Sequence, residues 1–227
     1  MKKVFYTEVA YLCGLIFLAF GCAFMEKADF GLSMVVAPAY ILSLKLGEIF
    51  DFITFGVMEY IFQAFLLILM ILAVRRFKLS YLFSFVTAVI YGYMLNGTMA
   101  IIGLMGDINI PVRVVLYISG MVLCSIGVAF MIHTYISPEV YELIVKEVPE
   151  KFGWNLTLFK TIYDCVSCIV GVALSFAFFG LWHFEGVKLG TVLCAFVNGF
   201  LIGRFSEFMV KHFEFKDALP LRKLFSK

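Results

Sequence analysis

Six long apolar segments dominate this sequence, and each is long enough to cross a lipid bilayer as a helix. A spanning helix needs roughly 20 mostly apolar residues. The chain has 227 residues, of which 63% are hydrophobic and 15% charged, whereas a soluble domain is about half apolar and about a quarter charged. We therefore predict an all-α polytopic membrane protein with six transmembrane helices, at residues 9–26, 54–74, 79–104, 112–133, 156–182 and 188–210.

Two shorter segments, 31–46 and 135–150, decide between six and eight spans. The first is apolar but short and contains Pro38, and the second carries too many charges to cross alone. Cytoplasmic loops are enriched in Lys and Arg, and the loop 75–78 reads Arg-Arg-Phe-Lys. This loop lies inside, together with the basic C-terminal tail, if neither short segment crosses. We therefore predict six spans with both termini in the cytoplasm.

The sequence also repeats itself at a nearly constant spacing. The stretch 14–25 matches the stretch 120–131 in its two glycines and its Ala-Phe-Met ending, 106 residues apart. Further positions match at 107 residues (Ala88 with Ala195, Gly92 with Gly199) and at 105 residues (Glu59 with Asp164). We predict a first membrane repeat over 1–107, a second over 108–211 and a cytoplasmic basic tail over 212–227.

Three spans in each repeat turn the second copy upside down relative to the first. Inverted repeats are a feature of many transporters, because they supply two mirrored conformations of one structure. The segments 31–46 and 135–150 would then lie on opposite sides of the membrane. Each is either re-entrant, which requires cover from protein or a water-filled cavity, or an amphipathic helix on the membrane surface. We favour re-entry for 31–46 and leave both interpretations open for 135–150.

Glu59 and Asp164 hold similar places in the second spanning segment of each repeat. An ionised carboxylate in hydrocarbon is costly, so such groups usually face a cavity or a partner. In the functional interpretation, this pair binds a cation or carries a coupling proton. In the structural interpretation, each acid only has a neutralising partner, such as Lys160 for Asp164, four residues away on one helix face.

Other polar side chains in or beside the apolar segments complete the candidate site. Gln63 shares a helix face with Glu59, and Asn96 and Asn198 lie beside glycines in the last span of each repeat. Such amides either line a path or hydrogen-bond neighbouring helices together. The predicted substrate-binding or ion-binding residues are Glu59, Asp164, Gln63, Asn96, Asn198, Ser33 and Ser137.

Short motifs follow one another in a fixed order along the second repeat: Ser137-Pro138-Glu139, Lys160 with Asp164, Lys188-Leu-Gly-Thr191 and Ala195-Phe-Val-Asn-Gly199. The first repeat has Gly31-Leu32-Ser33, with Ser84 in the Thr position. Over nearly the whole chain this order resembles the YczE/YitT-like bacterial integral membrane proteins. Glu139 replaces part of that family's Arg-Asp turn, Lys160 replaces an Arg, and Gly203 follows Gly199 without the family's Gly-Pro. The resemblance implies a multi-pass protein of a bacterial plasma membrane, in a group usually suspected of transport or export.

Several function classes find no support in the sequence. No basic tract with interleaved aromatics indicates nucleic-acid binding, and no Walker, GxSxG or HExxH motif indicates an enzyme. Cys165 and Cys168 form a lone C-x-x-C without a His cluster, and all six cysteines lie in apolar segments, as small apolar side chains do. We expect no enzymatic activity, no cofactor and no metal.

The leading hypothesis is therefore a secondary transporter or exporter of a small molecule, coupled to protons or cations through the intramembrane acids. Two alternatives stay open: an accessory or scaffolding membrane protein, and a substrate-binding membrane subunit of an ATP-driven importer. The expected partners are the lipid bilayer, a small-molecule or ion ligand and a second copy of the chain as a homodimer.

Overall fold

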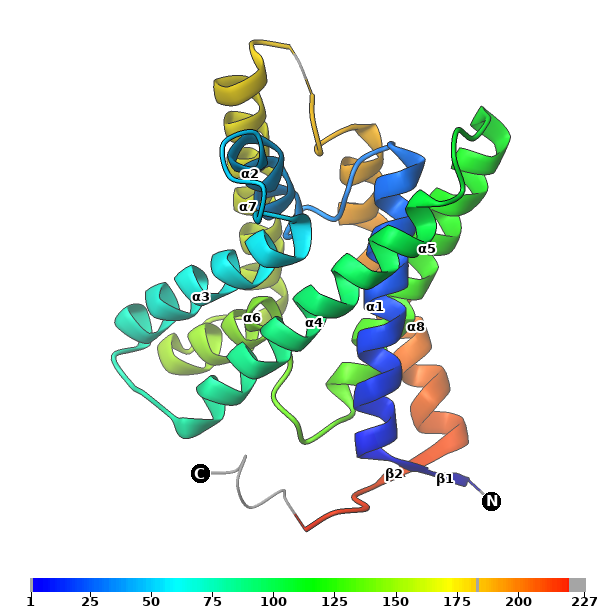
Figure 1. Cartoon of the computed structure of the whole chain (residues 1–227). Coiled ribbons are helices and arrows are strands. Elements are labelled where there is room, and N and C mark those ends of the chain that lie inside the picture. Colours follow the sequence, from blue (N-terminus) through cyan, green and yellow to red (C-terminus); the bar gives the residue numbers. More distant parts are fainter. Residues whose placement is uncertain (1, 183, 221–227) are drawn as a thin grey trace.

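The computed structural model describes residues 2–182 and 184–220, and these residues are mostly helical (Figure 1). In chain order the described elements are β1 (Lys3–Tyr6), α1 (Thr7–Ala28), α2 (Ala37–Gly47), α3 (Phe55–Val74), α4 (Leu79–Gly103), α5 (Ile110–Ile132), α6 (Val140–Phe152), α7 (Leu156–Phe179), α8 (Leu189–His212) and β2 (Phe213–Lys216). Six of these helices, all but α2 and α6, are long and apolar enough to cross a membrane. The six predicted spans are thus confirmed.

Local sequence signals explain where several helices begin and end. Thr54, Asn109 and Asn155 each precede a spanning helix, and each side chain accepts a hydrogen bond from the backbone N–H three residues later. Such caps satisfy amides that have no partner within the helix. Arg75 directly follows α3 and Gly153 directly follows α6, and both adopt the left-handed conformation that stops a helix.

α1 and α5 are in close contact, and they run antiparallel. A Cβ atom added at Gly14 would lie 3.1 Å from the carbonyl oxygen of Gly127, and one added at Gly21 would lie 2.7 Å from that of Gly120. Residue numbers rise along α1 while they fall along α5, so the second copy is upside down relative to the first. Because the repeat makes Gly14 equivalent to Gly120 and Gly21 to Gly127, the two contacts are also equivalent. The predicted inverted repeat is confirmed.

The eight helices form two bundles, and each bundle contains helices from both halves of the chain (Figure 1). In the core bundle (α1, α4, α5 and α8), α4 packs on α1 and α8 packs on α5. In the arm bundle (α2, α3, α6 and α7), each short helix crosses to the other half, since α2 packs on α7 and α6 packs on α3. Both short helices bury side chains against these partners, which is the protein cover that a re-entrant segment requires.

The turns before the two short helices dock on the first residues of α4 and α8. Ser137 donates a hydrogen bond from Oγ to the carbonyl oxygen of Ser80, at 3.0 Å. On the other side of the molecule, the backbone N–H of Gly190 donates to the carbonyl oxygen of Phe30, at 2.9 Å. Gly31 has a φ of +109°, and a Cβ atom there would lie 2.5 Å from Oγ1 of Thr191, so a larger residue would be strained.

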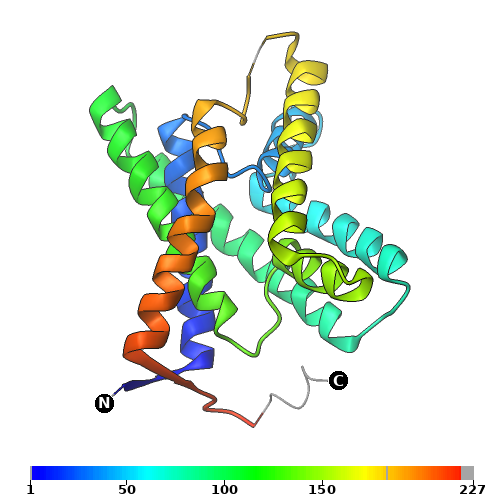
Figure 2. The same ribbon diagram turned by 180° about the vertical axis from the view of Figure 1, so that it is seen from behind.

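One contact distinguishes the two halves. α3 packs along α4, whereas α7 makes no comparable contact with α8 among the described residues. The arm bundle therefore rests against α4 and stands away from α8, as the view from behind shows for the yellow α7 and the orange α8 (Figure 2).

The predicted all-α class is confirmed, and the two ends add one short sheet that the sequence did not predict. β1 and β2 form a two-stranded parallel sheet in which Lys3 pairs with Phe213. The sheet forms because α1 begins and α8 ends on the same side of the molecule, which leaves four-residue flanks adjacent. The Phe5 ring then packs on the rings of Phe213 and Phe215, with centroids 5.4 and 5.9 Å away. The predicted basic tail thus starts with a strand, and its residues 221–227 lie outside the described part of the chain.

Candidate functional site

Two buried polar side chains lie one turn apart on α3, in the arm bundle. Glu59 and Gln63 are both fully inaccessible to solvent, and the amide Nε2 of Gln63 donates a hydrogen bond to Oε1 of Glu59 at 3.3 Å. Their spacing of four residues places them on one face of the helix, as the sequence predicted. The face points toward α6, the short helix of the other half.

Gln63 joins this face to the start of α6. Its Nε2 also donates to Oε2 of Glu139 at 3.2 Å, and its Oε1 accepts the backbone N–H of Val140 at 3.0 Å. Glu139 is the residue that precedes the first turn of α6, and it is 8% exposed. Two carboxyl groups, one from each repeat, therefore share the amide of one glutamine.

The remaining oxygens of these two carboxyl groups have no hydrogen-bond partner among the described residues. These atoms are Oε2 of Glu59 and Oε1 of Glu139. Burial, reinforced by the nearby Glu59 carboxyl, raises the pKa of Glu139 to about 8. Two ionised carboxylates cannot share a dry site without compensation, so this site is suited to hold a proton or a cation.

The acids lie where the arm bundle meets the core bundle. Tyr141 of α6, two residues after Glu139, is buried in the same apolar cluster as Cys22 of α1 and Tyr91 of α4. A relative movement of the two bundles would therefore change the surroundings of both carboxyl groups.

Asp164 occupies a separate polar group on α7. Its Oδ1 lies 3.8 Å from Nζ of Lys160, which also lies 3.7 Å from Glu142 of α6. Among the described residues, the predicted pair of Glu59 and Asp164 makes no direct contact, since Glu59 bonds to Gln63 and Asp164 faces Lys160. The two acids lie at different places along α6. Glu59 lies near Glu139, at the start of α6, and Asp164 lies near Glu142, with Lys160 between the two carboxylates.

The other predicted residues make contacts between elements. Asn96 accepts the backbone N–H of Gly56 at 2.8 Å and so joins α3 to α4. Asn198 accepts the Ser125 hydroxyl at 2.7 Å and joins α5 to α8. Ser137 docks the turn before α6, and the Ser33 carbonyl oxygen accepts two backbone N–H groups at the turn before α2. These contacts match the interpretation of the amides as links between helices.

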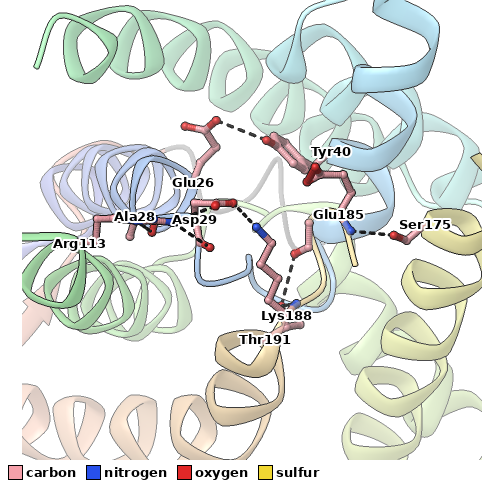
Figure 3. A network of polar contacts seen from close by, with 10 residues as sticks. Glu26, Ala28, Asp29, Tyr40, Arg113, Ser175, Glu185, Lys188 and Thr191 are labelled. Atoms are coloured by element: carbon pink, nitrogen blue, oxygen red, sulfur yellow. Dashed lines mark hydrogen bonds and ion pairs between the residues drawn. The ribbon is translucent and has the colours of Figure 1, made fainter. Parts of the chain in front are cut away.

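A second polar network lies around the C-terminal end of α1 (Figure 3). Asp29, at the end of α1, forms ion pairs with Arg113 of α5, at 2.8 Å, and with Lys188 before α8. Nε of Arg113 also donates to the carbonyl oxygen of Ala28 at 2.7 Å. Nearby, the Tyr40 hydroxyl of α2 donates to Glu26 at 3.4 Å. This network links α1 to both spans of the core bundle in the second half.

Two surface hollows have other linings. One of about 180 Å³ is lined by residues that include Arg76, Lys78 and Glu147, and one of about 360 Å³ by residues that include Lys3 and Lys211. Neither is lined by Glu59, Gln63 or Glu139. Within residues 2–182 and 184–220, no three His, Cys, Asp or Glu side chains converge in a way that could hold a metal ion.

A family model described only as a family of unknown function, DUF6198, matches residues 5–207. The chain belongs to the DUF6198 family. No curated protein and no solved structure matches it.

In this DUF6198 chain, the sequence interpretation missed Glu139 and Tyr141 as members of the acid site. Both lie in a segment with several charges, where an acid usually faces water. The available signal was the position of Glu139 directly before a helix whose Val140, Tyr141 and Ile144 form an apolar face, because that face has to be buried against a partner.

Proposed function

We propose that this protein is a secondary transporter or exporter of a small cationic solute, coupled to protons at Glu59 and Glu139. The observation that carries the proposal is the arrangement of the two buried carboxyl groups, one from each inverted repeat, on the single amide of Gln63. We further propose a bacterial plasma membrane with cytoplasmic termini, and kinship with the YczE/YitT-like proteins, from the charge distribution and the motifs described above.

The physical basis is competition for the same oxygens. When a proton neutralises one carboxyl group, the pair carries a single charge that Gln63 and the nearby hydroxyl of Tyr141 stabilise. When the proton leaves, the second charge is costly in a buried site unless a cation replaces it. A site that holds either a proton or a cation, but not both, exchanges one for the other.

The experiment is a binding screen by thermal unfolding of the purified protein in detergent at pH 6 and pH 8. The probes are sodium, potassium, guanidinium and small primary amines, with chloride and acetate salts as anion controls. We expect at least one cation to stabilise the protein, more strongly at pH 8, where fewer protons compete. A ligand at about 100 times its Kd stabilises by roughly 2.7 kcal/mol.

Matched variants show whether the acids are responsible. Glu59→Gln and Glu139→Gln should lose the stabilisation, whereas Glu207→Gln on α8, whose carboxylate is 75% exposed, should retain it. The proposal fails if no cation stabilises the protein or if the two variants respond as the unmodified chain does. Uptake of the identified cation into proteoliposomes then separates a transporter from a scaffolding protein, which would move nothing.

A further inference from the structure

A close helix contact in the first half is open at the equivalent place in the second half, beside Gly199 of α8. Gly56 of α3 meets Gly92 of α4 so closely that a Cβ atom on Gly92 would lie 2.5 Å from the Gly56 carbonyl oxygen. The repeat spacing makes Thr161 of α7 equivalent to Gly56, and Gly199 of α8 equivalent to Gly92. A Cβ atom on Gly199 would meet nothing within 4 Å.

The side chains of α7 and α8 would fit a similar close contact. In that contact the larger side chain would come from α7, whereas in the first half it comes from α4. In the first half, α3 contributes the glycine and α4 contributes the larger Asn96, which accepts the Gly56 N–H. In the second half, α7 contributes the larger Thr161, and α8 has Gly203 at the position equivalent to Asn96. Gly203, like Gly199, would have no atom within 4 Å of an added Cβ. α8 therefore presents a smooth surface with room for the threonine.

The positions of the helix ends indicate toward which side of the molecule the α3–α4 pair and the α7–α8 pair would each open. α3 and α4 are joined by the short loop 75–78, on the side of the molecule where β1 and β2 lie, whereas α7 ends and α8 begins on the opposite side (Figure 1). Two helices joined at one end can part only at the other. When α7 parts from α8, the gap opens toward the strands, and when α3 parts from α4, it opens away from them.

We propose that the arm bundle rocks between this conformation, in which α3 packs on α4, and a mirrored one, in which α7 packs on α8 through Thr161, Gly199 and Gly203. This inference rests on the proposed function, and it supplies the access that a transporter needs. In the present conformation Glu59 and Glu139 are buried, and the space between α7 and α8 lies on the side of the strands, from which the acids would be reached. In the mirrored conformation the corresponding space lies between α3 and α4, on the opposite side.

The residues beside the contact connect the movement to the acids. Tyr163 lies two positions from Thr161 on α7 and packs against the buried cluster that contains Tyr141 of α6. Lys160, the residue before Thr161, lies 3.7 Å from Glu142 of α6. Because α2, α3, α6 and α7 pack together as one bundle, docking of α7 on α8 would carry the Glu59–Glu139 site with it.

Disulfide cross-linking tests the mirrored conformation directly. The six native cysteines are replaced by alanine, and Thr161→Cys is combined with Gly199→Cys in proteoliposomes under mild oxidation. We expect a cross-link that forms at least tenfold faster than in a control with Thr161→Cys and Leu201→Cys, because residue 201 points to the opposite face of α8. No cross-link, or equal rates in the two pairs, would overturn the proposal.

A second measurement avoids both the cysteine replacement and the unknown solute. Gly199→Trp in the otherwise unmodified chain should leave the present conformation intact, since position 199 has open space, but should block docking of α7. Amide hydrogen exchange at Gly56 and Val57 should then slow at least tenfold, because α3 no longer leaves α4. An unchanged exchange rate would contradict the mirrored conformation.

These outcomes are distinguishable from failure of the proposed function. Cation binding that depends on Glu59, without cross-linking, would overturn only the rocking movement. Cross-linking without acid-dependent binding would retain the movement and overturn the assignment of the acids.

Discussion

The α3–α4 pair and the α7–α8 pair come from equivalent parts of the two repeats, yet only the first pair is closely packed. The crossing of α1 and α5, by contrast, obeys the repeat closely, since both of its glycine contacts are equivalent. The α1–α5 contact keeps the internal symmetry, and the α3–α4 and α7–α8 pairs break it. Because inverted repeats supply two mirrored arrangements of the same parts, this difference fits a rigid core bundle with a movable arm bundle.

The largest expected difference between the halves is in their response to pH. Glu139 in the second half is equivalent to Ser33 in the first, which cannot titrate. Its pKa is raised from 4.5 to about 8 in the folded protein, so the folded protein binds more protons than the unfolded chain in this interval. Stability should therefore fall as pH rises from about 4.5 to about 8 and then level off, by an amount on the order of several kcal/mol.

Thermal unfolding of Glu139→Gln between pH 4 and pH 9 checks this expectation. The variant should show a flatter pH dependence than the unmodified chain, since it lacks the titrating group. Parallel curves for the two proteins would contradict the buried position of Glu139, and Glu207→Gln serves as the exposed control.

The next effect tests the part of the molecule that obeys the symmetry. Gly14→Val and Gly120→Val both force side-chain atoms onto the opposing helix, where an added Cβ would already lie within 3.1 Å of Met131 or of Gly21. Each should lower the free energy of unfolding by about 3 kcal/mol, measured by denaturant titration in detergent. Losses that differ severalfold between the two would show that the core crossing is not symmetric.

A smaller and unequal effect is expected where the symmetry is broken. Gly92→Ala places a methyl group 2.5 Å from the Gly56 carbonyl oxygen and should cost about 2 kcal/mol. Gly199→Ala meets open space and should change stability by less than about 0.5 kcal/mol. Equal melting temperatures for the two variants would remove the difference between the halves.

The smallest effect concerns the junctions between α4 and α1 and between α8 and α5, which the rocking movement leaves unchanged. Ser125→Ala removes the hydrogen bond to Asn198, and Thr98→Val removes the 3.2 Å bond to the Ala19 carbonyl oxygen. Each should cost about 1 kcal/mol. A loss confined to one of the junctions, seen in the same titration, would indicate that only one is a fixed part of the core bundle.

The sequence predicted the features that depend on local composition. The lengths of the apolar segments predicted the six spans. The match of 14–25 to 120–131 predicted the two inverted halves, and its glycines recur because α1 and α5 approach each other too closely for larger residues. Glu59 and Gln63 were recognised as members of one helix face because their spacing fits a turn of helix.

The features that the sequence did not reveal depend on packing between distant segments. α2 and α6 each pack against the other half, and nothing in their own residues specifies the partner. Glu139 therefore gave no sign that it would meet Gln63, 76 residues away. The β1–β2 pair was missed for the same reason, since it joins the two ends of the chain. The separation of α7 from α8 could not be predicted from the sequence, because the residues of these helices would also fit a conformation in which the two helices pack together.

Solute-dependent proton movement is the most direct test of the central claim, that Glu59 and Glu139 exchange protons for a cation. The purified protein is reconstituted in liposomes that contain a pH-sensitive dye, and the stabilising cation is added to one side. We expect proton movement opposite to the cation in the unmodified protein and in Glu207→Gln, and at least a tenfold slower signal in Glu59→Gln and Glu139→Gln. Proton movement at an unchanged rate in the latter two variants would contradict it.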